Sequence, residues 1–145
     1  MKIQTKYFGE IETSEDEKIH FPGGIFGFET PADFLIIRFE DDNDAMLCLQ
    51  SAADERLAFV LLNPFYICEN YAPKLSDSDL ESLNATEATP MLVYAIAVVR
   101  ENFEESTINL KCPVVVNAEA KIARQVILDT GEYPIKHPLS AVKKG

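Results

Sequence analysis

Short runs of apolar residues, separated by turn-forming residues, recur along most of the chain. At the N-terminus Ile3, Thr5 and Tyr7 alternate with polar residues. This period-2 alternation places the three side chains on one face of a β-strand. The later runs are rich in β-branched and aromatic residues, which favour strands over helices. The pattern predicts further strands at residues 18–21, 34–39, 45–50, 57–62, 91–99, 107–116 and 123–128.

Turn-forming residues set the boundaries between these strands. Residues 22–27 contain a proline and three glycines, which predict a loop with unusual backbone freedom. Within this region we expect Phe26 to be exposed and Phe28 to enter the core. The acidic run at residues 40–44 predicts a hairpin tip. Asn63-Pro64 ends the run at 57–62, a strand that we expect to be buried on both faces.

One segment, residues 76–83, has the features of a helix. Ser78 and Glu81 stand at capping-box spacing, and acidic residues occupy the first turn. An otherwise strand-rich chain with many turns protects its sheet edges by closing the sheet. The sequence therefore predicts an all-β, antiparallel, barrel-like single domain over residues 1–145, with one or two short helices.

The chain is strongly acidic, with 24 Asp and Glu against 13 Lys and Arg and a net charge of -11. Residues 1–105 hold 21 acids and 7 bases, whereas residues 106–145 hold 3 acids and 6 bases. This balance disfavours direct binding of nucleic acid. The N-terminus lacks the apolar core of a signal peptide, and no run approaches the roughly 18 apolar residues of a membrane helix. We expect a soluble, cytoplasmic monomer that makes no membrane contact.

Residues that could support catalysis are sparse. His20 and His137 are the two histidines, and neither adjoins a Ser or Cys in a nucleophile motif. Phosphate-binding glycine motifs are absent, and the three cysteines lack metal-ligand spacing. The sequence predicts no catalytic residue, no cofactor and no metal. The alternative is a small β-barrel enzyme or ligand-binding module with a pocket lined by His20, Tyr133 and His137. A purely structural subunit is least favoured, because the charge opposes close self-packing.

Three stretches form an ordered set that spans nearly the whole chain. The first is IHFPGGIFGFE at residues 19–29. The second combines LQS at 49–51 with FVLLNP at 59–64. The third is TINLKCPVVVN at 107–117, continued by QVIL at 125–128 and YPIKHPL at 133–139. Each is weak alone, but together they are similar to the FliW family of flagellar assembly factors.

The resemblance implies a partner-switching protein without enzymatic activity. FliW-like proteins bind the C-terminal region of flagellin in the cytoplasm. When flagellin has been exported, they bind CsrA, an RNA-binding dimer that represses translation of the flagellin message. Capture of CsrA then restores flagellin synthesis. An acidic surface suits the basic regions of an RNA-binding partner.

Candidate partner-binding residues come from the charge pattern and from the resemblance. Two acidic groups are candidates for docking CsrA. The alternative interpretation is that both groups are solvated turns that add only solubility. Phe26 stands where the family often has Pro, and Lys136 stands where it often has Arg. Lysine offers a point charge in place of a planar fork. The candidates are Glu40, Asp41, Asp42 and Asp44 in the first acidic group, Glu101, Glu104 and Glu105 in the second, and Phe26, Tyr133, Lys136 and His137 outside them.

Overall fold

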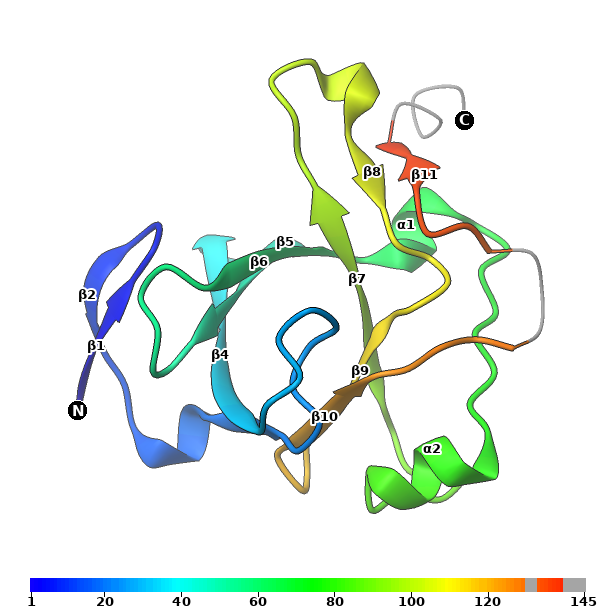
Figure 1. The fold of residues 1–145 in the computed structure, drawn as a ribbon, viewed down its shortest axis with the longest axis horizontal. Coiled ribbons are helices and arrows are strands. Elements are labelled where there is room, and N and C mark those ends of the chain that lie inside the picture. The colour runs from blue at the N-terminus through cyan, green and yellow to red at the C-terminus, as the bar shows by residue number, and fades with distance from the viewer. Residues whose placement is uncertain (130–132, 140–145) are drawn as a thin grey trace.

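The structure is a computed structural model that describes residues 1–129 and 133–139 (Figure 1). Most of the predicted strands are present, some longer and others shorter than predicted. The strands are β1 (Lys2–Thr5), β2 (Gly9–Glu12), β3 (Ile19–Phe21), β4 (Ala32–Glu40), β5 (Asn43–Ser51), β6 (Ala58–Leu62), β7 (Leu92–Val98), β8 (Thr107–Ile108), β9 (Val114–Asn117), β10 (Ile122–Gln125) and β11 (His137–Pro138). The helices are α1 (Pro64–Ile67) and α2 (Asp77–Ser82), with 3-10 turns η1 (Glu15–Glu17) and η2 (Phe103–Glu105).

The main sheet closes on itself. Its strand order is β11-β8-β7-β6-β5-β4-β3-β10-β9, and β9 also pairs with β7. Seven strands, β7, β6, β5, β4, β3, β10 and β9, therefore form a closed barrel, while β8 and β11 extend from β7 (Figure 1). The pairings are antiparallel except for β10 with β3. The predicted all-β barrel is confirmed, and closure leaves its strands without an open edge.

Two apolar clusters hold this fold together. The first fills the barrel interior and includes Phe21, Phe34, Leu49 and Leu61, which are buried. The rings of Phe21 and Phe34 meet edge to face, with centroids 5.0 Å apart. The second cluster includes Tyr71, packs on the other side of the β7–β9 pair and is partly covered by the chain around α1 and α2 (Figure 1).

Three strand predictions were wrong in detail. Tyr7 lies beyond β1 and is exposed, because the hydroxyl of Thr5 accepts a hydrogen bond from the Phe8 amide (2.9 Å) and turns the chain. The run at 107–116 is two strands, because the Asn109 side chain accepts from the Cys112 amide (2.9 Å) and forms a turn. In β6 only Leu61 is buried, so this strand is not buried on both faces.

The predicted helix is present as α2, but its cap was assigned to the wrong residue. Ser76 is the N-cap: its side chain accepts from the Asp79 amide at 3.0 Å. The Asp79 carboxylate in turn accepts from the Ser76 amide at 3.2 Å. Both Ser76/Asp79 and Ser78/Glu81 have the capping-box spacing, so spacing alone could not select the pair.

Candidate functional site

The loop after β3 lies over one mouth of the barrel. The Gly24 amide donates to the Phe21 carbonyl (3.0 Å), and the positive φ of Gly24, 67°, turns the chain back. Ile25 and Phe28 exchange backbone hydrogen bonds of 3.2 and 2.6 Å, which close a tight turn. Ile25 is buried in the barrel core, whereas Phe26 is 44% exposed, as predicted. Phe28 is 52% exposed, so its expected place in the core is wrong.

Gln125 holds this loop in position. The side chain is buried at the end of β10, and its Oε1 accepts a hydrogen bond from the Phe26 amide at 2.9 Å. Its Nε2 donates to the Cys112 carbonyl at 3.1 Å. A buried amide that satisfies two backbone groups is costly to remove. Phe26 is therefore exposed on a loop whose backbone is anchored.

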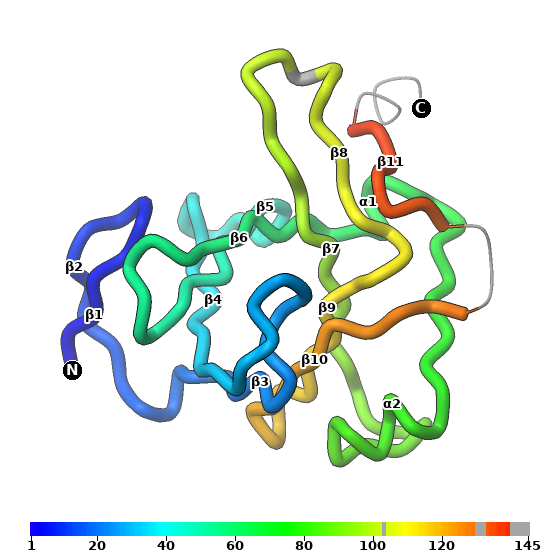
Figure 2. The backbone as a smooth tube through the Cα atoms, viewed as in Figure 1, coloured from blue at the N-terminus to red at the C-terminus, as the bar shows by residue number. Residues whose placement is uncertain are grey.

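The opposite wall is formed by the β7–β8 hairpin and the segment 133–139, which runs beside it (Figure 2). The Leu110 amide donates to the Pro134 carbonyl (3.1 Å), and the Leu139 amide donates to the Ser106 carbonyl (3.0 Å). The buried Ser106 hydroxyl accepts from the Arg100 amide at 2.8 Å. These bonds fix the Arg100 amide and the backbone on both sides of Lys136.

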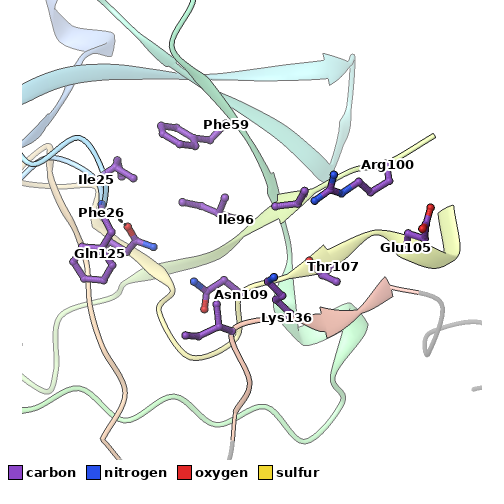
Figure 3. Close-up of a pocket in the computed structure, with 12 residues that line it drawn as sticks. Ile25, Phe26, Phe59, Ile96, Arg100, Glu105, Thr107, Asn109, Gln125 and Lys136 are labelled. Carbon is purple, nitrogen blue, oxygen red and sulfur yellow. Dashed lines mark hydrogen bonds between the residues drawn. The ribbon is translucent and has the colours of Figure 1, made fainter. Parts of the chain in front are cut away.

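Between the two walls lies a groove of about 350 Å³ (Figure 3). Phe59 and Ile96 lie between Phe26 on one side and Arg100 on the other. Phe26, Val98 and Ile135 line the groove while keeping 44%, 48% and 55% of their surface exposed. Concave apolar surface with a few polar groups is typical of binding sites. We call this feature the mouth groove. It is lined by Ile25, Phe26, Phe59, Ile96, Val98, Arg100, Glu105, Thr107, Asn109, Gln125, Ile135 and Lys136.

The mouth groove brings together three of the candidates, Phe26, Glu105 and Lys136. Tyr133 lies on the same segment but turns elsewhere: its hydroxyl accepts from the Ala72 amide at 2.9 Å, and its ring packs on Tyr71. Arg100 also lines the groove, although it is not among the candidates taken from the sequence. The sequence signal that could have identified Arg100 is its position just after the apolar residues that end β7.

The first acidic group lies at the tip of the β4–β5 hairpin, as predicted. Asp44 accepts from Arg38 Nε at 2.6 Å, and this partner raises the pKa of the Arg38 guanidinium. Glu40 accepts from the Asn43 side chain at 3.2 Å. All four carboxylates of the group are exposed. Asp42 adopts a positive φ of 61°, which Asp tolerates better than most residues.

Beside this tip the surface forms an open, acidic depression of about 940 Å³. Asp41 and Asp44 line it together with Glu12 and Glu17, which sequence analysis did not associate with them. Apolar side chains from β4 and β7 lie among these acids, and the exposed ring of Tyr66 borders them. The β4–β5 hairpin and the segment from β2 to η1 are distant in sequence, and the fold brings them together at this depression. The second acidic group, Glu101, Glu104 and Glu105, lies on the β7–β8 hairpin and is exposed.

The structure places the two histidines of the alternative interpretation on different strands. His20 lies on β3, where its Nδ1 is 2.8 Å from a carboxylate oxygen of Asp33. His137 lies on β11 and pairs with Ile108 of β8. The mouth groove contains neither histidine nor Tyr133.

The part of the chain that the structure describes contains no group of three metal-ligating side chains. Its helices are also too short to cross a membrane. Cys48 and Cys112 are buried thiols, while Cys68 is half-buried. Burial raises the pKa of the Cys48 thiol to about 11, which disfavours the reactive thiolate.

Fold and groove define a class, the small closed β-barrel with an apolar groove at its mouth. The chain belongs to the FliW family, since the family model described as "FliW protein" matches residues 2–139. A flagellar assembly factor FliW from Exiguobacterium sp. is 41% identical over 143 residues, covering 99% of this chain and 97% of that protein. One from Alkaliphilus metalliredigens is 39% identical over 137 residues, covering 94% and 85%. A crystal structure of the flagellar assembly factor FliW matches with a TM-score of 0.88 at 37% identity, covering 96% of each chain.

Proposed function

We propose that this chain is a non-enzymatic, cytoplasmic flagellar assembly factor that binds the C-terminal region of flagellin. When flagellin has been exported, it binds CsrA instead and relieves the repression of flagellin translation. Membership of the FliW family supports a role in flagellar assembly. The observation that carries the binding role is the mouth groove, with its exposed apolar side chains on anchored backbone.

The two partners suit two different surfaces. We assign the C-terminal region of flagellin to the mouth groove, because this groove has exposed apolar side chains. CsrA binds RNA and presents basic regions, which the acidic depression and the β4–β5 tip complement. The mouth groove and the acidic depression share no lining residue, which supports separate docking sites.

Charge repulsion alone is too weak to keep RNA off a CsrA molecule bound here. One carboxylate about 10 Å from a phosphate repels it by roughly 0.4 kcal/mol in water. Physiological salt reduces this by about a factor of three at that distance. Several pairs give about 1 kcal/mol, so obstruction of the RNA path or a changed CsrA conformation contributes most of the effect.

Size-exclusion chromatography of the purified chain with flagellin, and separately with CsrA, tests the proposal. We expect both partners to co-elute with the chain. Val98→Asp places a charge on an exposed groove position and should abolish co-elution with flagellin. Ile127→Asp is the matched control, because Ile127 is 53% exposed and is not a lining residue of the groove. If the wild-type chain co-elutes with neither partner, the proposal is wrong.

Association kinetics test the CsrA surface. Changing Asp41 and Asp42 to Asn keeps the turn geometry and removes two charges, so association with CsrA should slow and become less dependent on salt. The control changes Glu81 and Glu87, two exposed acids outside the depression, to Gln. An association rate that is equal in both variants at low salt would remove the hairpin tip from the interface.

A further inference from the structure

Two positive side chains border the mouth groove, although the protein has a net charge of -11. Arg100 and Lys136 are exposed and come from different segments. Within residues 1–129 and 133–139, none of the ion pairs includes either of them. Glu105 is the acidic residue among the lining residues. Among the lining residues, cations therefore outnumber carboxylates, in contrast to the acidic protein as a whole.

The groove is organised before any partner arrives. Gln125 fixes the Phe26 amide, and Ser106 fixes the Arg100 amide. Phe28, beside the groove, packs edge to face on the lining residue Phe59, with centroids 5.9 Å apart. Anchored backbone lowers the cost of ordering on binding, so more of the contact energy appears as affinity.

The polar residues of the lining favour a peptide as the occupant. Thr107 and Asn109 are half-buried and line the groove. A bound peptide carries amide groups that need hydrogen-bond partners, and side chains of these types supply them. The groove volume of about 350 Å³ fits a few side chains rather than a folded domain.

We propose that the mouth groove recognises a segment of the flagellin C-terminal region in which apolar side chains adjoin a carboxylate. The apolar side chains cover Phe59 and Ile96, and the carboxylate is received by Arg100 and Lys136. This inference rests on the proposed function, because it names the feature of flagellin that the groove selects. A planar guanidinium can bind a carboxylate through two parallel hydrogen bonds, and an ammonium can bind it as a point charge.

A charge-neutralising pair of variants tests the inference. Arg100→Gln combined with Lys136→Gln should weaken binding of a purified flagellin C-terminal fragment about tenfold, as expected for two partly exposed ion pairs. The control, Lys2→Gln combined with Arg56→Gln, removes the same charge from exposed positions outside the groove lining and should leave the affinity unchanged. Lys136→Arg retains the charge and should bind at least as tightly as the wild type.

A scan of the fragment identifies the carboxylate. Each acidic residue of the fragment is changed in turn to its amide, and affinity is measured by calorimetry. One amide substitution should weaken binding to the wild type and have no further effect on the doubly neutralised variant, which is the signature of direct coupling. Equal losses in both proteins for every position would overturn the inference.

The outcomes separate this inference from the proposed function. If the wild-type chain binds the fragment and the doubly neutralised variant binds it equally well, the inference is wrong and the proposed function stands. If the wild-type chain does not bind, the proposed function itself fails. Sodium decanoate serves as a second probe. Saturable decanoate binding that depends on Arg100 and Lys136, with unchanged affinity for flagellin, would assign the groove to a free fatty acid and overturn the inference.

Discussion

Gly24 is the position where a single added carbon should do most damage to the loop over the barrel mouth. Its φ is 67°, a left-handed conformation that side chains disfavour. A Cβ built there would overlap the Phe28 carbonyl oxygen and would lie 2.6 Å from the Thr30 carbonyl oxygen. Both atoms belong to the backbone, so no side chain can rotate away to relieve the contact. Gly24→Ala must displace the loop itself.

Alanine substitutions at three glycines of this chain should differ in how much they lower the free energy of unfolding. Gly9 has a similar φ of 66° but open space around it, and Gly23 has open space without a positive φ. Gly23→Ala should be neutral or stabilise by about 0.5 kcal/mol, because it restricts the unfolded chain. Gly9→Ala should cost about 1 kcal/mol for backbone strain alone. Gly24→Ala adds about 1–3 kcal/mol of overpacking to that strain.

Urea denaturation followed by circular dichroism measures the three free energies of unfolding. We expect the order Gly23→Ala, Gly9→Ala, Gly24→Ala from most to least stable, with the last losing about 2–4 kcal/mol of a total near 5–15 kcal/mol. The usual error of additivity is about 0.5 kcal/mol. If the free energies of unfolding of Gly24→Ala and Gly9→Ala differ by less than this, the argument from backbone contact is refuted. Such a result would show that the loop moves at little cost.

Further predictions concern buried polar groups and thiols. Gln125→Ala leaves the Phe26 amide and the Cys112 carbonyl without a partner, so it should cost about 1–3 kcal/mol in urea denaturation. Tyr71→Phe removes the hydroxyl that donates to the Leu110 carbonyl at 2.7 Å and should cost about 1–2 kcal/mol in the same assay. Burial raises the pKa of Cys48 from 9.0 to about 11, so the unfolded chain releases this proton first as pH rises. Stability should therefore fall between about pH 9 and 11, a decline that Cys48→Ala should reduce in denaturation curves measured across that range.

The sequence by itself determined the class of fold and most of its strands. Period-2 alternation places β1, and β-branched and aromatic composition places β4 to β7. Local turn chemistry also identified the β4–β5 tip and the end of β6 before Pro64. The FliW resemblance predicted the family that the comparisons confirm. Each of these features depends on residues close together in the chain.

Tertiary structure decided which residues share a site. Phe26 and Lys136 line one groove because β3, β7 and the segment 133–139 converge at the barrel mouth. Closure of the barrel by β9 with β7 is a non-local pairing that no short window of sequence encodes. Phe28 shows the same limit: the tight turn that buries Ile25 in the core leaves the Phe28 side chain exposed beside Phe59. Periodicity predicts which face of a strand its apolar side chains share, but packing decides whether other residues cover that face.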